Sequence, residues 1–327
     1  MTDTAPPAAD SAPFVRPDVA AFLQFLNAIP GPRMHEQDPP TARAAFLMMK
    51  DVADLPAGDL AVRRDLVMPG PAGDIRLRLY DARAERAPGP VMVFFHGGGF
   101  VIGDLDSHDG FCAEAARALD LPVVAVDYRL APEHPFPAAP IDCEAAARWI
   151  AASPDLLGRE ATGLVLAGDS AGGNLTIVTA LALRDQPAAV PVIAMWPIYP
   201  VVDDGAAYPS FRAFADGFLL TGDSMRWFSD HYRAAAGDAR NTPILADPAG
   251  LPPCLIITAG LDPLRDQGRA YAGRLIAAGV PTSYREARGN IHGFITLRRA
   301  IPSAADDCAG CFAVLRAMIA EAMGKAA

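Results

Sequence analysis

The chain has 327 residues, of which 51% are apolar and 20% charged, and its formal net charge is −10. This composition is typical of a soluble globular protein with a large buried sheet, and the length suffices for one large α/β domain or two ordinary ones. Because the charge is negative and no run of Lys and Arg interrupts it, we expect neither nucleic acid nor an anionic membrane as a partner.

Residues 1–13 contain no basic residue and no apolar core, so we expect a disordered segment rather than a secretory signal. The longest uncharged apolar stretch, 187–202, carries four prolines and is not expected to cross a membrane. The five cysteines are scattered and odd in number, which favours a reducing, cytoplasmic location. Cys308 and Cys311 form a C-x-x-C, but no second Cys/His pair lies nearby; we expect semi-buried helix positions and no metal site.

Two short amphipathic helices, at 17–29 and 41–53, precede the first strand and are expected to lie outside the sheet. Strands and helices then alternate, which predicts a mostly parallel sheet covered on both faces. Strands are predicted at 62–68, 74–81, 91–95, 122–127, 163–168, 191–196, 253–258 and 281–287, and helices at 108–119, 138–152, 171–184, 264–278 and 304–323. A short Pro/Gly turn at 69–73 makes the first two strands antiparallel.

One pentapeptide, Gly168-Asp169-Ser170-Ala171-Gly172, stands between an apolar strand and a buried helix. A serine on such a tight turn adopts a strained backbone that raises its hydroxyl above the sheet, and small residues two positions away relieve the crowding. This context predicts the nucleophile elbow of a serine hydrolase.

A serine hydroxyl needs a base, and the base needs an acid that orients it. In hydrolases with a nucleophile elbow, the order along the chain is nucleophile, acid, histidine. Only His231 and His292 follow Ser170. His292 lies in a Gly-flanked loop after the last strand and is preferred, whereas His231 falls within the aromatic-rich insertion. Asp262, just after the strand at 253–258, is the preferred acid; Asp266, one helical turn later, is its rival.

Backbone N–H groups must also point at the carbonyl oxygen on which negative charge develops. Ala171, at the start of the helix after the serine, is one predicted donor. The glycine-rich loop His96–Phe100, directly after a strand, is expected to supply the others, since successive glycines let the backbone approach the substrate. The loop does not fit a dinucleotide fingerprint, because no G-x-G-x-x-G pattern runs into a helix.

Four ordered motifs together carry a resemblance: residues 96–100, 127–139, 168–173 and 262–266. Over residues 60–323 the chain resembles the bacterial hormone-sensitive-lipase family (family IV) of carboxylesterases, in the branch whose elbow reads GDSAG. The resemblance implies an α/β-hydrolase fold with an eight-stranded sheet. It also implies a helical cap, built from an N-terminal segment (1–55) and an insertion at about 200–235 of the catalytic domain (56–327). It further implies hydrolysis of short- to medium-chain acyl esters without a cofactor, and homodimers in many members.

Carried over by position, the resemblance makes Ser170 the nucleophile, His292 the base and Asp262 its orienting acid. The oxyanion amides are those of Gly98, Gly99 and Ala171, and His96 is a structural member of its loop. Candidate substrate-binding residues are Phe100, Phe214, Phe218 and Leu219. A structural ion pair between Arg129 and Glu133 is expected near the site. Two positions depart from the family pattern: Gln267 stands in place of a usual Glu, and Asn290 in place of a common Met.

Two alternatives stay open at this point, and a third is disfavoured. An amidase or a lactonase would use the same acyl-enzyme route. A non-catalytic receptor of the same fold, like the related gibberellin receptors, would have lost the histidine, which is present here as His292. A lipase acting on long-chain emulsions is disfavoured, because the insertion shows no amphipathic interfacial helix with a basic face.

Overall fold

The computed structural model describes residues 12–203 and 208–324. The disorder predicted for residues 1–13 falls almost wholly outside this part of the chain, as do residues 204–207 of the predicted cap insertion.

The described residues form an eight-stranded sheet with the strand order β1-β2-β4-β3-β5-β6-β7-β8. Its strands are β1 (Val62–Gly70), β2 (Gly73–Asp81), β3 (Gly89–Phe95), β4 (Val123–Asp127), β5 (Ala161–Asp169), β6 (Val192–Ile198), β7 (Cys254–Leu261) and β8 (Thr282–Ile291). β2 pairs antiparallel with β1 and with β4, and all other neighbours pair parallel. All eight predicted strands are confirmed, and so is the antiparallel first pair.

The central strand β5 explains why these strands read as apolar runs. Leu164 and Leu166 belong to the core on one face of the sheet, while Val165 and Ala167 belong to the core on the other. A strand in a sheet covered on both sides alternates between two dry faces, so the side chains in its middle are apolar.

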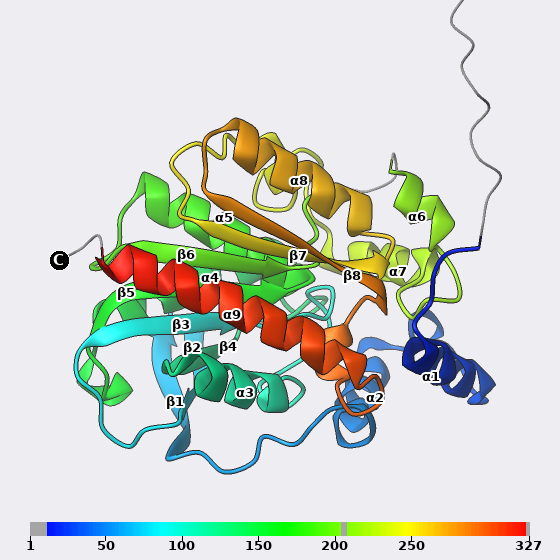
Figure 1. Ribbon diagram of the computed structural model, residues 1–327, viewed down its shortest axis with the longest axis horizontal. Helices are drawn as coiled ribbons and strands as arrows, with labels where there is room; N and C mark the ends of the chain where they lie inside the picture. Colours follow the sequence, from blue (N-terminus) through cyan, green and yellow to red (C-terminus); the bar gives the residue numbers. More distant parts are fainter. Residues whose placement is uncertain (1–11, 204–207, 325–327) are drawn as a thin grey trace, which may run out of the picture.

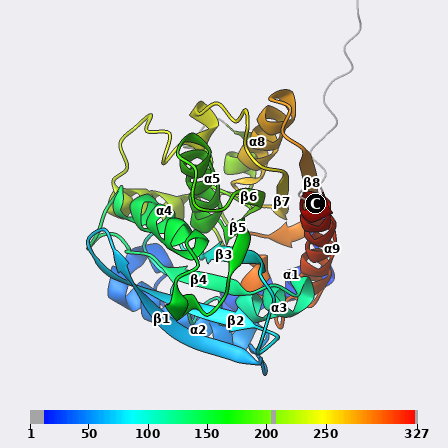
Figure 2. The same ribbon diagram turned by 90° about the vertical axis from the view of Figure 1, so that its left-hand side faces the viewer.

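Helices cover both faces, as predicted. Helices α4 (Ala138–Ala151), α5 (Ala171–Asp185) and α8 (Arg265–Ala277) pack on one core, and α3 (Asp109–Leu119) and α9 (Ser303–Gly324) on the other. Figure 2 shows α3 and α9 on one side of the sheet and α4 and α5 on the other. Cys308 and Cys311 lie on α9, as expected, but both are fully buried free thiols rather than semi-buried ones.

Four further helices gather at one end of the sheet, on the right in Figure 1. They are α1 (Pro17–Ala28), α2 (Pro39–Ala53), α6 (Pro209–Ala213) and α7 (Gly222–Tyr232). The sequence predicted α1 and α2 but not the last two. With only five residues, α6 is too short to show a helical period in the sequence. Helix α7 begins at an N-cap, where Thr221 Oγ1 accepts the N–H of Ser224.

Short 3₁₀ turns complete the described structure: η1 (Met34–Glu36), η2 (Asp155–Leu157), η3 (Pro243–Leu245) and η4 (Phe294–Thr296). Helix α7 packs against η1, so the insertion and the N-terminal segment touch each other. None of the helices described combines the length and apolar character needed to cross a bilayer.

Candidate active site

Ser170 lies on the sharp turn between β5 and α5, with φ 56° and ψ −116°. This region is sparsely populated for a residue with a side chain, costs about 1–3 kcal/mol and occurs mostly at functional sites. The flanking glycines make the turn possible. A Cβ on Gly168 would lie 2.4 Å from Gly172 O, and one on Gly172 would lie 1.9 Å from Phe95 O. The strand, turn and helix predicted around Ser170 are therefore present, with a steric reason for each glycine.

The ends of β7 and β8 bring an acid and an imidazole to this serine. His292 Nε2 lies 2.8 Å from Ser170 Oγ, and His292 Nδ1 lies 2.7 Å from Asp262 Oδ2. The three residues are buried, with exposed fractions of 9% for Ser170, 8% for His292 and 0% for Asp262. When Asp262 is ionised, Nδ1–H donates to it, which leaves the Nε2 lone pair free to accept the serine proton.

The two rival residues have other partners. His231 lies on α7, where its Nδ1 is 2.7 Å from the carbonyl oxygen of Trp227. Asp266 accepts the N–H of Ser210 and pairs with Arg265, so it ties α6 to the start of α8. Burial alone would raise the pKa of Asp266, but Arg265 and the Ser210 hydrogen bond hold it below its usual value.

The glycine loop after β3 approaches Ser170, and its Gly97 N–H donates to Asp169. Within residues 12–203 and 208–324, the N–H groups of Gly98, Gly99 and Ala171 donate no hydrogen bond. Gly98 has φ 118°, and a Cβ there would lie 2.1 Å from Ile102 O, so only glycine fits. The N–H of Ala171 is free because it opens a helix and has no carbonyl one turn before it.

His96, at the start of this loop, has a structural environment. Its ring stacks on Tyr128 with centroids 4.3 Å apart, and the Tyr128 hydroxyl donates to His96 O at 2.7 Å. Burial lowers the pKa of His96, so the neutral imidazole is favoured.

Residues 92–296 match the family described as alpha/beta hydrolase fold. The chain belongs to this family. It is 38% identical to the esterase LipI of Mycobacterium tuberculosis, over 91% of this chain and 93% of that protein. It is 34% identical to an ethyl acetate hydrolase of Pseudomonas putida, over 89% and 95% of the two chains.

A solved structure agrees with these sequence relatives. The hyperthermophilic esterase from the archaeon Pyrobaculum calidifontis superposes with a TM-score of 0.88 at 37% identity, covering 94% of this chain and 99% of that one. The predicted α/β-hydrolase fold and the hormone-sensitive-lipase type are confirmed, and the protein is a carboxylic ester hydrolase.

The candidate substrate-binding residues of this hydrolase divide into two groups. The first packs inside the protein: the Phe100 ring stacks on Tyr232 at 3.9 Å, and the buried Phe214 meets Phe218 edge to face at 5.3 Å. The second is Leu219, which lies beside the loop of His292: its Cδ2 would be 3.8 Å from a Cβ on Gly293.

The sequence did not single out Phe228, which is one of several aromatic residues in the insertion. A Cβ on Gly99 would lie 2.3 Å from the Phe228 ring, so helix α7 of the hydrolase places an aromatic face directly on the glycine loop. The missing information was the position of α7, because several aromatic residues of the insertion look equivalent in the sequence.

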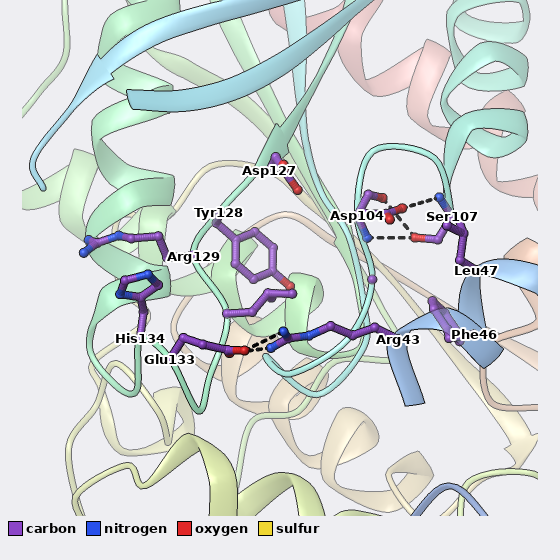
Figure 3. A pocket seen from close by; sticks show the side chains of 12 residues that line it. Arg43, Phe46, Leu47, Asp104, Ser107, Asp127, Tyr128, Arg129, Glu133 and His134 are labelled. Atoms are coloured by element: carbon purple, nitrogen blue, oxygen red, sulfur yellow. Dashed lines mark hydrogen bonds and ion pairs between the residues drawn. The ribbon is translucent and has the colours of Figure 1, made fainter. Parts of the chain in front are cut away.

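Arg43 on α2 ties the N-terminal segment to the same loop. Its Nε donates to Val101 O at 2.8 Å, and its two terminal nitrogens bind Glu133. Figure 3 shows Arg43 reaching Glu133 across the wall of a polar cavity of about 460 Å³. The predicted Arg129–Glu133 ion pair is therefore wrong. Glu133 pairs with Arg43 of the N-terminal segment, and Arg129 pairs with Asp142 at 2.7 Å.

The two departures from the family pattern have clear partners. Gln267 Oε1 accepts the N–H groups of Val202 and Asp203 at 2.7 and 3.0 Å, so its carbonyl provides the acceptor that a carboxylate would offer. Asn290 Nδ2 donates to Asp307, which is also bound by Arg16 through both terminal nitrogens. The segment before His292 is thus joined to α9 and to the chain before α1.

Proposed function

We propose that Ser170, His292 and Asp262 are the catalytic triad of this carboxylic ester hydrolase, and that Gly98, Gly99 and Ala171 form its oxyanion hole. One observation carries the proposal: an unbroken line of two short hydrogen bonds runs from Asp262 through His292 to Ser170. The serine is at a strained strand-to-helix turn and the acid is fully buried, as this chemistry requires.

Hydrolysis then proceeds in two steps. Ser170 Oγ attacks the ester carbonyl while His292 Nε2 takes its proton, and Asp262 stabilises the imidazolium that forms. The tetrahedral oxyanion accepts hydrogen bonds from the three amides. His292 returns the proton to the leaving alcohol, and a water molecule activated by the same imidazole releases the acid from Ser170.

The Ser170→Ala variant tests the nucleophile. We expect kcat on p-nitrophenyl butyrate to fall by about 1,000-fold or more. The low activity that remains would come from substrate binding and the oxyanion amides. A fluorophosphonate probe should label the wild-type protein and not the variant. Near-wild-type hydrolysis by Ser170→Ala would contradict the assignment, and an unlabelled wild type would favour the receptor alternative.

His292→Gln and His231→Gln form a matched pair. Both remove an imidazole from the region after Ser170, but only the first breaks the hydrogen bond to the nucleophile. We expect activity to be lost in His292→Gln and kept in His231→Gln. The reverse result would reassign the base.

We further propose a preference for short- to medium-chain acyl groups. Leu219 and Phe228 stand close to Gly293 and Gly99, which limits the space over the reacting carbonyl. The similarity to an ethyl acetate hydrolase is in line with small acyl groups. A series of p-nitrophenyl esters from acetyl to dodecanoyl tests this, and a maximum of kcat/KM at the longest chain would refute it.

The assembly of the hydrolase is also a proposal. We infer that residues 1–55 and about 200–235 form a cap over the catalytic domain, because α1, α2, α6 and α7 of the described part gather at one end of the sheet (Figure 1). The homodimer, the cytoplasmic location and the GDSAG branch stay predictions. Light scattering after size-exclusion chromatography tests the dimer, and cell fractionation tests the location.

A further inference from the structure

The residue before the nucleophile carries a buried carboxylate that the triad does not use. Asp169 is 4% exposed, at the end of β5. Its Oδ1 accepts the N–H of Gly97 at 2.7 Å and lies 3.1 Å from His108 Nε2, and its Oδ2 accepts the Tyr199 hydroxyl at 3.3 Å. One side chain therefore contacts the glycine loop, the N-cap of α3 and the segment after β6.

A carboxylate in such a dry place needs a compensating charge. Burial would raise the pKa of Asp169, but the charge and hydrogen bond of His108 and the N–H of Gly97 hold the pKa below its usual value. His108 is itself buried, and its Nδ1 lies 3.0 Å from Ser107 Oγ, so both ring nitrogens have partners. The carboxylate is therefore kept ionised next to the nucleophile.

The glycine loop rests directly on this carboxylate. A Cβ on Gly97 would lie 2.4 Å from Asp169 Oδ2, so the absence of a side chain at Gly97 is what allows the contact. Ser170 follows Asp169 in the chain, and the oxyanion amides of Gly98 and Gly99 follow Gly97. The hydrogen bond from Gly97 to Asp169 thus joins the residue before the nucleophile directly to the residue before the proposed oxyanion donors.

The third contact leads to the base. The Tyr199 ring, whose hydroxyl donates to Asp169, packs against the imidazole of His292 with centroids 4.6 Å apart. The Asp169 carboxylate therefore contacts both the loop with the proposed oxyanion amides and Tyr199, which packs against His292. Asp169 is also the residue directly before Ser170 in the chain.

We propose that Asp169 and His108 are a positioning pair for the reaction: together they set the oxyanion loop relative to Ser170. The proposal rests on the proposed triad and oxyanion hole. Amides that meet an oxyanion only in the transition state contribute to kcat and not to ground-state binding. Loss of the pair should therefore lower kcat while KM stays nearly unchanged.

Three variants test the pair. Asp169→Ala removes the acceptor for Gly97 and should lower kcat by about 100-fold or more, as loss of one oxyanion donor does elsewhere. Asp169→Asn keeps an oxygen for the Gly97 N–H, removes the charge and should lose less. Asp142→Asn is the matched control, because Asp142 is equally buried, pairs with Arg129 and accepts its backbone N–H without touching the glycine loop. It should keep kcat.

A second readout separates positioning from general damage. A trifluoromethyl ketone, which forms a tetrahedral adduct with an active serine, should bind Asp169→Ala more weakly by the same factor as kcat falls. Normal kcat or unchanged ketone binding in folded Asp169→Ala, or a loss confined to KM, would overturn the pair. If Asp169→Ala does not fold, Asp169→Asn decides: a kcat loss in it and not in Asp142→Asn supports the pair, and equal kcat in both refutes it. An active Ser170→Ala would instead refute the proposed function itself.

Discussion

The contact between Gly99 and Phe228 allows a sharp test of the proposed oxyanion loop. Gly99 has φ 59°, in the left-handed region, and a Cβ there would lie 2.3 Å from the Phe228 ring. Gly99→Ala therefore has two effects. It places a side chain in a conformation that costs about 1–2 kcal/mol, and it forces either the ring or the loop to move.

The two effects can be separated with Gly279, in the turn between α8 and β8. Gly279 has φ 78°, but a Cβ there would meet nothing within 4 Å. Gly279→Ala should thus show only the conformational cost, as a lower midpoint of thermal unfolding with unchanged kcat. Gly99→Ala should show the same cost in stability and a further loss of about 100- to 1,000-fold in kcat, equal to about 2.7–4 kcal/mol, if the loop moves and one oxyanion donor is misplaced.

A double variant tests whether the Phe228 ring causes the loss of kcat in Gly99→Ala. Phe228→Ala removes the ring that a Cβ on Gly99 would strike, so the Gly99→Ala/Phe228→Ala protein should recover much of the lost kcat, and the two effects should not add. Rates are measured with p-nitrophenyl butyrate at saturation. The reasoning is refuted if Gly99→Ala keeps wild-type kcat, or if the double variant is no faster than Gly99→Ala.

Three further predictions concern other parts of the protein. Asp262→Asn keeps the shape of the acid but favours the wrong tautomer of the histidine, so kcat should fall by about 10,000-fold at neutral pH, and near-wild-type rates would contradict this. The hydrogen bond from Arg43 lowers the pKa of Glu133 from 4.5 to about 2, so the pair stabilises the fold above pH 4.5 and loses this contribution as the pH falls towards 2. Because the Glu133 side chain is 49% exposed, the advantage of wild type over Glu133→Gln in urea unfolding should be below about 1 kcal/mol at neutral pH and vanish near pH 2; a gap that widens in acid would refute the sign. Burial raises the pKa of Cys311 to about 12 and that of Cys308 further, so iodoacetamide should label neither thiol until the protein unfolds, and rapid labelling of the native protein would contradict their burial.

Much of the fold follows from local sequence. The central strands of a sheet covered on both faces are short apolar runs, the outer strands β1, β2 and β8 mix apolar and polar residues, and the crossover helices have their own period. The eight strands are therefore visible without tertiary information. The order of Ser170, Asp262 and His292 is also local information, because each residue lies two to five positions after a predicted strand. Parallel strands place their carboxyl ends at one edge, which is why residues 122 positions apart meet within 2.8 Å.

The pairings that support the site depend on the tertiary structure alone. With 28 basic and 38 acidic residues, the sequence offers many partners for Glu133, and the choice of Arg43 depends on where α2 docks. The contact of Phe228 with Gly99 likewise depends on the position of α7, whose helix the sequence did not reveal. Asp169 is visible in the pentapeptide, but its link to His108 and Gly97 is not. Such contacts are long-range and depend on how packed elements meet. A strand or a turn, by contrast, is determined by residues next to one another in the chain.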